Sequence, residues 1–371
     1  MFQFKLPRSY VAHLFREAGG VPDPLSPVVR LWTDLSAIEP ADSPGAELPL
    51  SATALRTVVE SLLRPGKLTA IRLGGHRNVP EQHRFASLEN DGVHAGITQL
   101  GSGELLIEGF ETQSSLIDWV AAAITPLQLA HQAGTRLIPE ILTTGQYLHL
   151  LHLIDFYRRC HYQSMLDYTA EDELSFSSLT FSETLFESLQ SGDYRWILPA
   201  SSIVAPTSIT GPGEDSFRWL GEHGLVTRAK DARHAGLWTF DEIGERLGLE
   251  FFTGWLCGAG IETGIATDAG PRRGKDALVI HTTIKGLHSF RLGPDGAVRY
   301  EPLGAADLRE PLQCLLDQKP GESVPLLEKA VKKREETAQV SHGPKFCAHC
   351  GSPIRPTMKF CSSCGAKVPG A

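Results

Sequence analysis

The pattern of apolar and polar residues alternates between helical and strand-like periods along most of the chain. Leu55, Val58 and Leu62 recur at helical spacing, which predicts a helix from Ser51 to Leu63. The same reasoning predicts helices over 10–18, 116–124, 127–168 with an interruption near 143–145, 181–189, 214–224, 239–247 and 305–316. It predicts strands over 68–73, 92–101, 104–110, 194–198, 277–284, 287–292 and 296–301. This mixture indicates an α+β fold with antiparallel sheets.

Two orders of elements recur along the sequence. Residues 60–62, followed by Gly66 and a strand, match residues 187–189, followed by Gly192 and a predicted strand. Residues 103–108 lead into a helix and match residues 296–301, which do the same. We therefore expect two α+β halves, residues 1–168 and 169–319. The spacing between the matched pairs differs, so internal duplication is one interpretation and two independent halves are the other.

The final segment carries two matched pairs of cysteines. Cys347 and Cys350 form one Cys-x2-Cys pair, Cys361 and Cys364 form the other, and ten residues separate them. A glycine follows each pair directly and can take the positive φ that closes a tight turn. Four thiolates suit a closed tetrahedral site for one structural Zn²⁺, with no ligand position left for water or substrate.

Residues 346–365 resemble the short zinc-ribbon modules found at the ends of many bacterial and archaeal proteins. The segment departs from the commonest form at Ala348-His349, where a proline usually begins the first turn. His349 is a further donor, but four cysteines already fill the site, so a role outside the ligand set is favoured. A disulfide or a redox Cys-x-x-Cys is the alternative, which two matched pairs disfavour. We expect zinc to supply the folding free energy of so short a module.

A break and a charged stretch separate the ribbon from the rest of the chain. Pro320-Gly321 interrupts the pattern, residues 326–339 are rich in charge, and His342-Gly343-Pro344 is a hinge. We therefore expect a linker over 320–345 and a tethered zinc ribbon over 346–371.

Composition and the remaining cysteines indicate the compartment. Hydrophobic residues make up 42% of the chain and charged residues 21%, as in ordinary soluble proteins. The first residues lack the pattern of a signal peptide, and no apolar stretch reaches membrane-spanning length. Cys160, Cys257 and Cys314 lie in apolar sequence and are predicted to be reduced and buried. These features predict a cytoplasmic protein without membrane insertion.

Charge is unevenly placed. From Ser341 onward the chain has four basic residues and no carboxylate, whereas the remainder has 31 basic and 43 acidic residues and a net charge of −12. The acidic body disfavours a body-wide nucleic-acid surface. The ribbon could contact phosphate or an acidic partner; its basic and apolar candidates are Lys345, Arg355, Lys359, Phe346, Ile354 and Phe360.

One helix carries residues that could bind metal. His149, His152 and Asp155 fall at i, i+3 and i+6, and two histidines one turn apart can share an ion in a helical bundle. No Glu-x-x-His accompanies them, so packing histidines are favoured. Cys160 and His161 are adjacent and point to different sides of a helix, which disfavours a thiol–imidazole pair.

Four further segments have patterns that superficially indicate function. Residues 210–215 resemble a phosphate loop but lack the Gly-Lys-Ser/Thr ending. Gly258-Ala259-Gly260 favours close packing over cofactor contact, and the basic residues 271–275 favour a solvated turn. Residues 217–226 and 239–247 have a winged-helix pattern, but acids on the second helix favour a protein partner over DNA.

The plan of two α+β halves without catalytic motifs is similar to that of the cytoplasmic chaperones of ESX-type secretion. No motif carries the similarity, so no residue role is transferred. We predict a non-catalytic cytoplasmic adaptor or assembly protein that docks partner proteins, and we assign no catalytic or cofactor-binding residue. A nucleic-acid-binding protein acting through the ribbon is the first alternative. An enzyme without a recognisable motif is the second.

Overall fold

The chain divides into two compact units, residues 1–325 and residues 326–371. The computed structural model describes residues 2–18, 21–30, 52–75, 81–87, 94–99, 104–125, 136–168, 174–191, 193–201, 212–230, 234–319, 324–325, 345–346 and 353–354. The division of the first unit at residue 168, and the linker over 320–345, stay predictions.

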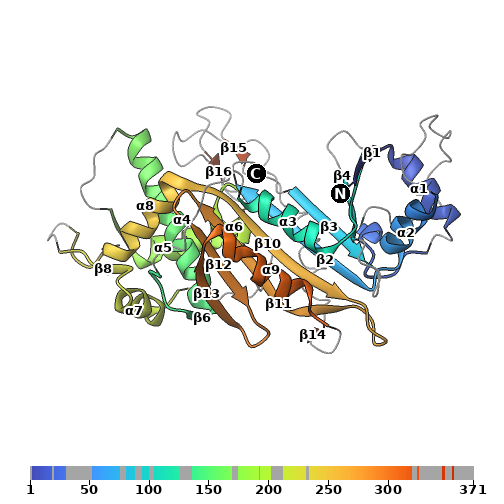
Figure 1. Cartoon of the computed structure of the whole chain (residues 1–371). Coiled ribbons are helices and arrows are strands. Elements are labelled where there is room, and N and C mark those ends of the chain that lie inside the picture. Colours follow the sequence, from blue (N-terminus) through green and yellow to red (C-terminus); the bar gives the residue numbers. More distant parts are fainter. Residues whose placement is uncertain are drawn as a thin grey trace. The chain divides into compact units, whose positions relative to one another are not determined.

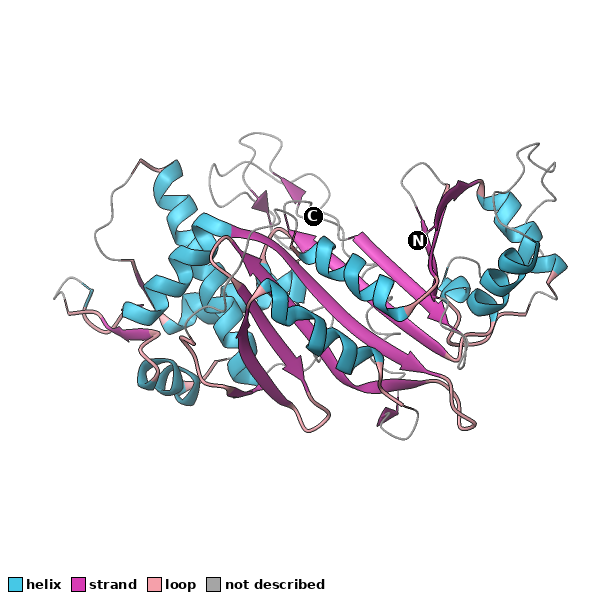
Figure 2. Cartoon of the chain, viewed as in Figure 1, coloured by secondary structure: helices cyan, strands magenta, loops and turns pink. Residues whose placement is uncertain are grey.

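One 11-stranded antiparallel sheet runs through the first unit. Its strands, in spatial order, are β1 (Phe2–Leu6), β5 (Leu105–Phe110), β4 (His94–Gln99), β3 (Glu81–Ser87), β2 (Lys67–Gly75), β10 (Trp255–Ile265), β11 (Arg272–Thr283), β12 (Leu287–Leu292), β13 (Ala297–Leu303) and β6 (Ile141–Thr143). Strand β14 (Val324–Pro325) also pairs with β11. Strands near in sequence pair as meanders, and Figure 2 shows the strands of the sheet in magenta.

The pairing of β2 with β10 joins two four-stranded meanders. Ile71 lies opposite Ile261, and the pairing extends for four residues to either side, from Lys67 opposite Ile265 to Gly75 opposite Cys257. Each meander is preceded by a helix, α2 (Ala52–Leu63) or α8 (Glu242–Gly254), and followed by helical turns. The two meanders therefore have the same order of elements, although duplication itself stays a prediction.

Helices cover both faces of the sheet, which explains the continuous apolar run in β11. Leu278 and Ile280 pack with α3 (Gln113–Ile124), with the 3-10 turn η3 (Ala305–Leu308) and with α9 (Arg309–Leu316). Ala277 and Val279 belong to a second core on the other face, because successive residues of a strand point to opposite faces. Figure 1 shows α3 and α9 side by side over the strands, where Arg309 forms an ion pair with Asp118.

A third core lies near the edge of the sheet that β1, β5 and β4 form. Here α1 (Arg8–Glu17), the 3-10 turn η1 (Pro27–Arg30) and α2 pack on β4 and β5. Val58, Val59 and Leu62 of α2 are buried there, as the helical spacing predicts.

The helices at the far end of the sheet pack around α4 (Thr144–Leu166). Thr143 and Gln146 form a capping box at its start, which explains the interruption predicted near residues 143–145. Around α4 lie α5 (Ser178–Gln190), α6 (Ile197–Ser201), α7 (Glu214–Glu222) and α8. A small antiparallel sheet of β7 (Ser175–Phe176), β9 (Trp238–Phe240) and β8 (Val226–Arg228) completes this region.

The α+β class with antiparallel sheets is confirmed, but the predicted strand over 194–198 is wrong. The N–H groups of Ile197 and Leu198 donate to the buried carboxylate of Asp155 at 2.9 and 2.8 Å. This contact begins helix α6, because a carboxylate at a helix N-terminus satisfies its first N–H groups. The match between residues 60–62 and 187–189 is wrong for the same reason, since a helix follows the second segment.

Three other predictions need correction. Residues 238–240 form strand β9, and helix α8 begins only after Asp241, whose side chain caps it. The helix predicted over 127–168 begins only at Thr144 among the described residues, because residues 136–140 are irregular and residues 141–143 form strand β6. Strands β1, β3 and β10 were not predicted. Cys314 is exposed, and Cys160 and Cys257 are only partly buried. The charged residues 326–339 and Ser51, where the predicted helix over 51–63 begins, lie outside the described residues.

Candidate metal centre and exposed surfaces

A short hairpin flanks the first cysteine pair of the ribbon. Strands β15 (Lys345–Phe346) and β16 (Pro353–Ile354) pair antiparallel, with Lys345 opposite Ile354. The chain between them carries the first Cys-x2-Cys pair, which is the order expected of a zinc ribbon. The four cysteines lie outside the described residues, so the ligand set Cys347, Cys350, Cys361 and Cys364 stays a prediction. Its chemistry fits Zn²⁺, which prefers four thiolates in closed structural sites.

The histidines and the aspartate of α4 do not converge. The His152 ring is fully buried, and its Nε2 lies 2.9 Å from the carbonyl oxygen of Phe181 on α5. Burial lowers the pKa of His152 to about 3, so the ring is neutral. Asp155 instead binds the start of α6. Within the described ranges no group of three His, Cys, Asp or Glu side chains could hold a metal.

Asp155 lies in a buried ion pair surrounded by aromatic rings. Arg158 Nη1 donates to its Oδ1 at 3.0 Å, and both side chains are nearly fully buried. The Arg158 guanidinium also lies 4.8 Å from the ring centroid of Trp255 and 5.1 Å from that of Trp196. The group therefore holds α4, α6 and β10 together, which is a structural role.

The structure contains two sets of buried, hydrogen-bonded polar side chains that no sequence motif predicts. Glu250 Oε1 accepts hydrogen bonds from Thr283 and His288 at 2.7 and 3.0 Å. Burial acts to raise the pKa of Glu250, but these hydrogen bonds lower it below its usual range. Separately, His281 Nε2 lies 2.8 Å from Ser201 Oγ, and burial lowers the pKa of His281 to about 3. Both groups join residues far apart in sequence, which is why no spacing indicates them.

The other candidate segments have structural roles in packing, in ion pairs or at the start of a helix. Gly258 lies in β10, where a Cβ would come within 2.8 Å of His281 Nδ1, so close packing explains it. Arg273 lies at the start of β11, 3.6 Å from a Glu262 oxygen. The His161 ring packs against Tyr157 and Phe252 at 4.3 and 5.2 Å. Of residues 210–215, the described part begins helix α7 with two acids.

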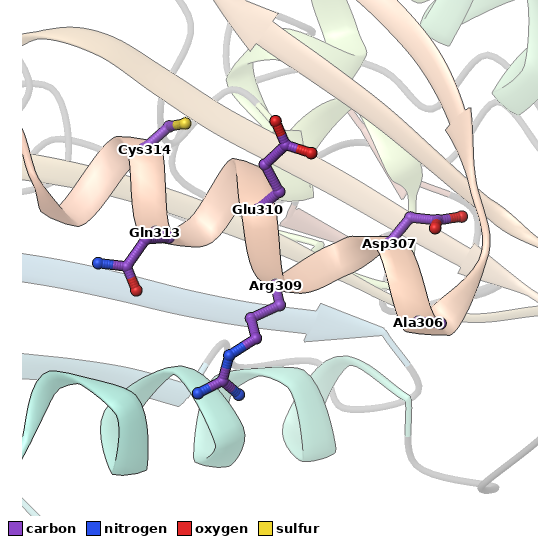
Figure 3. Close-up of a pocket in the computed structure, with 6 residues that line it drawn as sticks. All are labelled: Ala306, Asp307, Arg309, Glu310, Gln313 and Cys314. Atoms are coloured by element: carbon purple, nitrogen blue, oxygen red, sulfur yellow. The ribbon is translucent and has the colours of Figure 1, made fainter.

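A surface depression lies on the outer side of η3 and α9. It is lined by Ala306, Asp307, Arg309, Glu310, Gln313 and Cys314. Figure 3 shows that Arg309 reaches toward α3, whereas Glu310 and Cys314 point the other way. Divergent, exposed side chains such as these do not converge on one ligand atom, as a binding site requires.

The small sheet has the strand order expected of a winged helix. β7 pairs with β9 and β9 with β8, and α7 precedes the β8–β9 hairpin. The exposed face of α7 carries Glu214, Asp215 and Glu222, and Arg218 is paired with Asp215 at 2.8 Å. The second helix of the pattern, α8, also has two acids in its first turn, Glu242 and Glu245. Acidic helices of this kind would repel phosphate, and the choice of a protein partner over DNA stays a prediction.

Large apolar side chains are exposed where α4 ends. Tyr162, Met165, Leu166 and Tyr168 are 43, 64, 73 and 97% exposed; we call these four residues the α4 tip. The first three lie at i, i+3 and i+4 and are neighbours on one helix face. Figure 1 shows this end of α4 in green at the upper left. Exposed apolar patches of this kind are typical of protein interaction sites.

Two comparisons with known proteins gave matches. The zinc-ribbon family model matches residues 346–368, which confirms the predicted ribbon. The structure of the Mycobacterium tuberculosis type VII secretion system chaperone EspG5, solved in complex with a PE25-PPE41 dimer, matches with a TM-score of 0.46 and 9% identity. The match covers 86% of this chain and 97% of EspG5. It is the loose similarity of plan expected from the sequence, and it establishes neither a shared function nor a shared partner.

No curated protein matches the chain. Among the described residues, no helix combines the length and apolar character that crossing a bilayer requires.

Proposed function

We propose that the protein is a non-catalytic cytoplasmic adaptor or assembly protein. It docks partner proteins through its first unit, and its C-terminal ribbon, held by one structural Zn²⁺ on Cys347, Cys350, Cys361 and Cys364, provides a second contact. The α4 tip is the observation that carries the proposal. A folded protein keeps four large apolar side chains in water at a free-energy cost, and burial against a partner recovers that cost.

The test is capture of partners by the intact chain and by two variants. One variant lacks residues 341–371; the other carries Cys361→Ser and Cys364→Ser, which removes two proposed zinc ligands and keeps the length of the chain. The intact chain is expected to retain one protein at a fixed stoichiometry. Both variants are expected to retain much less of it, because the ribbon needs zinc to fold.

Two outcomes would contradict this proposal. If the intact chain retains no protein at a fixed stoichiometry, it is not an adaptor. If both variants retain as much partner as the intact chain, the ribbon provides no contact.

Nucleic-acid binding through the ribbon is a second candidate, because residues 341–371 carry four basic residues and no carboxylate. Gel shifts with single- and double-stranded nucleic acid over a salt series test it. Binding with a steep salt dependence, lost when Lys345, Arg355 and Lys359 are replaced by Gln, would favour this candidate over the adaptor. The adaptor predicts no shift at physiological salt.

A further inference from the structure

The α4 tip is continuous with a partly buried group of aromatic rings. The Tyr162 ring packs edge-on against Phe252 at 5.0 Å and against Trp196 at 6.1 Å between centroids. Trp196 and Phe252 are themselves half-buried. The apolar surface therefore extends from the tip onto the neighbouring α8 and the start of α6, and it is wide enough to contact more than one side chain of a partner.

The backbone at Tyr168 is unusual. Its φ is 53°, and it is the one non-glycine residue with positive φ within the described ranges. A residue with a Cβ adopts this left-handed conformation at a free-energy cost. The conformation places a phenol ring almost entirely in solvent, just past the last residue of α4. Two independent observations, exposure and backbone conformation, thus coincide at the tip.

The C-terminal end of α4 itself is negative. A helix C-terminus carries partial negative charge, and the last turn of α4 contains no basic residue. Asp167 adds a carboxylate at the C-cap, where Gln163 donates to it at 2.8 Å. The cation one turn earlier, Arg159, is stacked on Trp196 at 4.6 Å. In the sequence, two residues separate Tyr168 from the acids Glu171, Asp172 and Glu173.

We propose that the α4 tip binds an amphipathic helix of a partner protein that carries Lys or Arg beside its apolar face. The inference rests on the proposed adaptor function and names its class of partner. Apolar residues of the partner helix cover Met165, Leu166 and Tyr168, and its cations meet Asp167 and the C-terminus of α4. A second copy of the chain would bring an equally negative tip, and an anionic membrane would be repelled in the same way.

Met165 provides a direct probe, because the chain contains only three methionines, Met1, Met165 and Met358. The zinc-loaded full chain, labelled with ¹³C in the methionine methyl groups, is titrated with a helical peptide of Leu and Lys that has one apolar face. A second peptide has Glu in place of every Lys. The Met165 resonance, assigned with Met165→Leu, is expected to shift saturably with the Lys peptide. The Glu peptide is expected to bind at least about tenfold more weakly.

Two matched variants separate the tip from non-specific binding. Leu166→Asp places a charge in the tip, whereas Leu179→Asp makes the same change on α5 at a leucine of similar exposure, 66%. Leu166→Asp is expected to abolish the shift of Met165, and Leu179→Asp is expected to preserve the Kd. Circular dichroism checks that both variants fold.

Several outcomes would overturn the proposal. These are a Met165 resonance that does not respond to the Lys peptide, equal affinity for both peptides, or equal loss in the two variants. A Met165 shift that grows with protein concentration in the absence of peptide would assign the tip to self-association. A shift with anionic lipid vesicles as large as that with the Lys peptide would assign it to a membrane. If Met165 does not respond to the Lys peptide but the chain still retains a stoichiometric partner, the tip is not the binding site and the adaptor function stands.

Discussion

At the scale of single residues, the ion pair between Asp155 and Arg158 has a near-identical counterpart on the surface. Asp215 and Arg218 have the same spacing along a helix and a similar distance, 2.8 Å against 3.0 Å. The first pair is buried and the second is exposed. Comparison of the two separates the effect of burial from that of sequence spacing.

We expect Asp155→Asn to lower the free energy of unfolding by about 3 to 5 kcal/mol, because it leaves the buried guanidinium of Arg158 without its counter-charge. It also replaces a carboxylate oxygen that accepts an N–H of α6. Asp215→Asn is the control and is expected to change stability little, because water solvates both partners. Urea denaturation of the two variants measures the difference, and equal losses would contradict this account of α6.

Contacts between individual side chains were the least predictable part of the structure. The sequence places His152 and Asp155 on one helix. Their spacing is compatible both with a metal site and with a packing role. The choice between them depends on Phe181 and Ile197, which lie well outside the helix in sequence and reach it only in the folded chain. The network of Glu250, His288 and Thr283 had no signal for the same reason.

At the scale of elements, α4 is a helix whose first four turns are almost entirely buried. These turns include His152, which is neutral. Helices α2 and α3 and the β11–β13 meander were predicted well from their apolar patterns. The strand β10 was missed because Gly258, Gly260 and Gly264 interrupt its apolar pattern. In the structure, a Cβ at Gly258 would come within 2.8 Å of His281, and a Cβ at Gly264 would come within 2.7 Å of Leu25, so neighbouring side chains would have to shift.

The buried His152 of α4 makes the free energy of unfolding depend on pH. The folded-state pKa of His152 is about 3, below the ordinary value of 6.5, so the unfolded chain binds the additional proton as pH falls below 6.5. Stability is therefore complete above about pH 6.5 and is lost progressively toward pH 3, at up to about 1.4 kcal/mol per pH unit for each such histidine.

Chemical denaturation between pH 5 and 7.5 measures this slope. His152→Gln keeps a side-chain N–H donor but cannot titrate, so its slope is expected to be smaller by the contribution of one proton. Identical slopes for the two proteins would show that His152 is not held neutral in the folded state.

At the scale of the whole molecule, the α+β class, the antiparallel sheets and the zinc ribbon were predictable. Two cysteine pairs identify the ribbon without reference to any other part of the chain. The joining of two meanders into one sheet was not predictable, because the pairing of Ile71 with Ile261 is between residues that no local pattern connects. The α4 tip was also missed, since apolar residues at the end of a helix look like core in the sequence.

The most direct test of the proposed adaptor is native mass spectrometry of the full chain, purified under reducing conditions without chelator. The account predicts a species with the mass of the chain, one zinc ion and one bound partner protein, and it predicts that Cys361→Ser with Cys364→Ser removes the zinc. A spectrum that contains only the metal-free, unbound chain would contradict it.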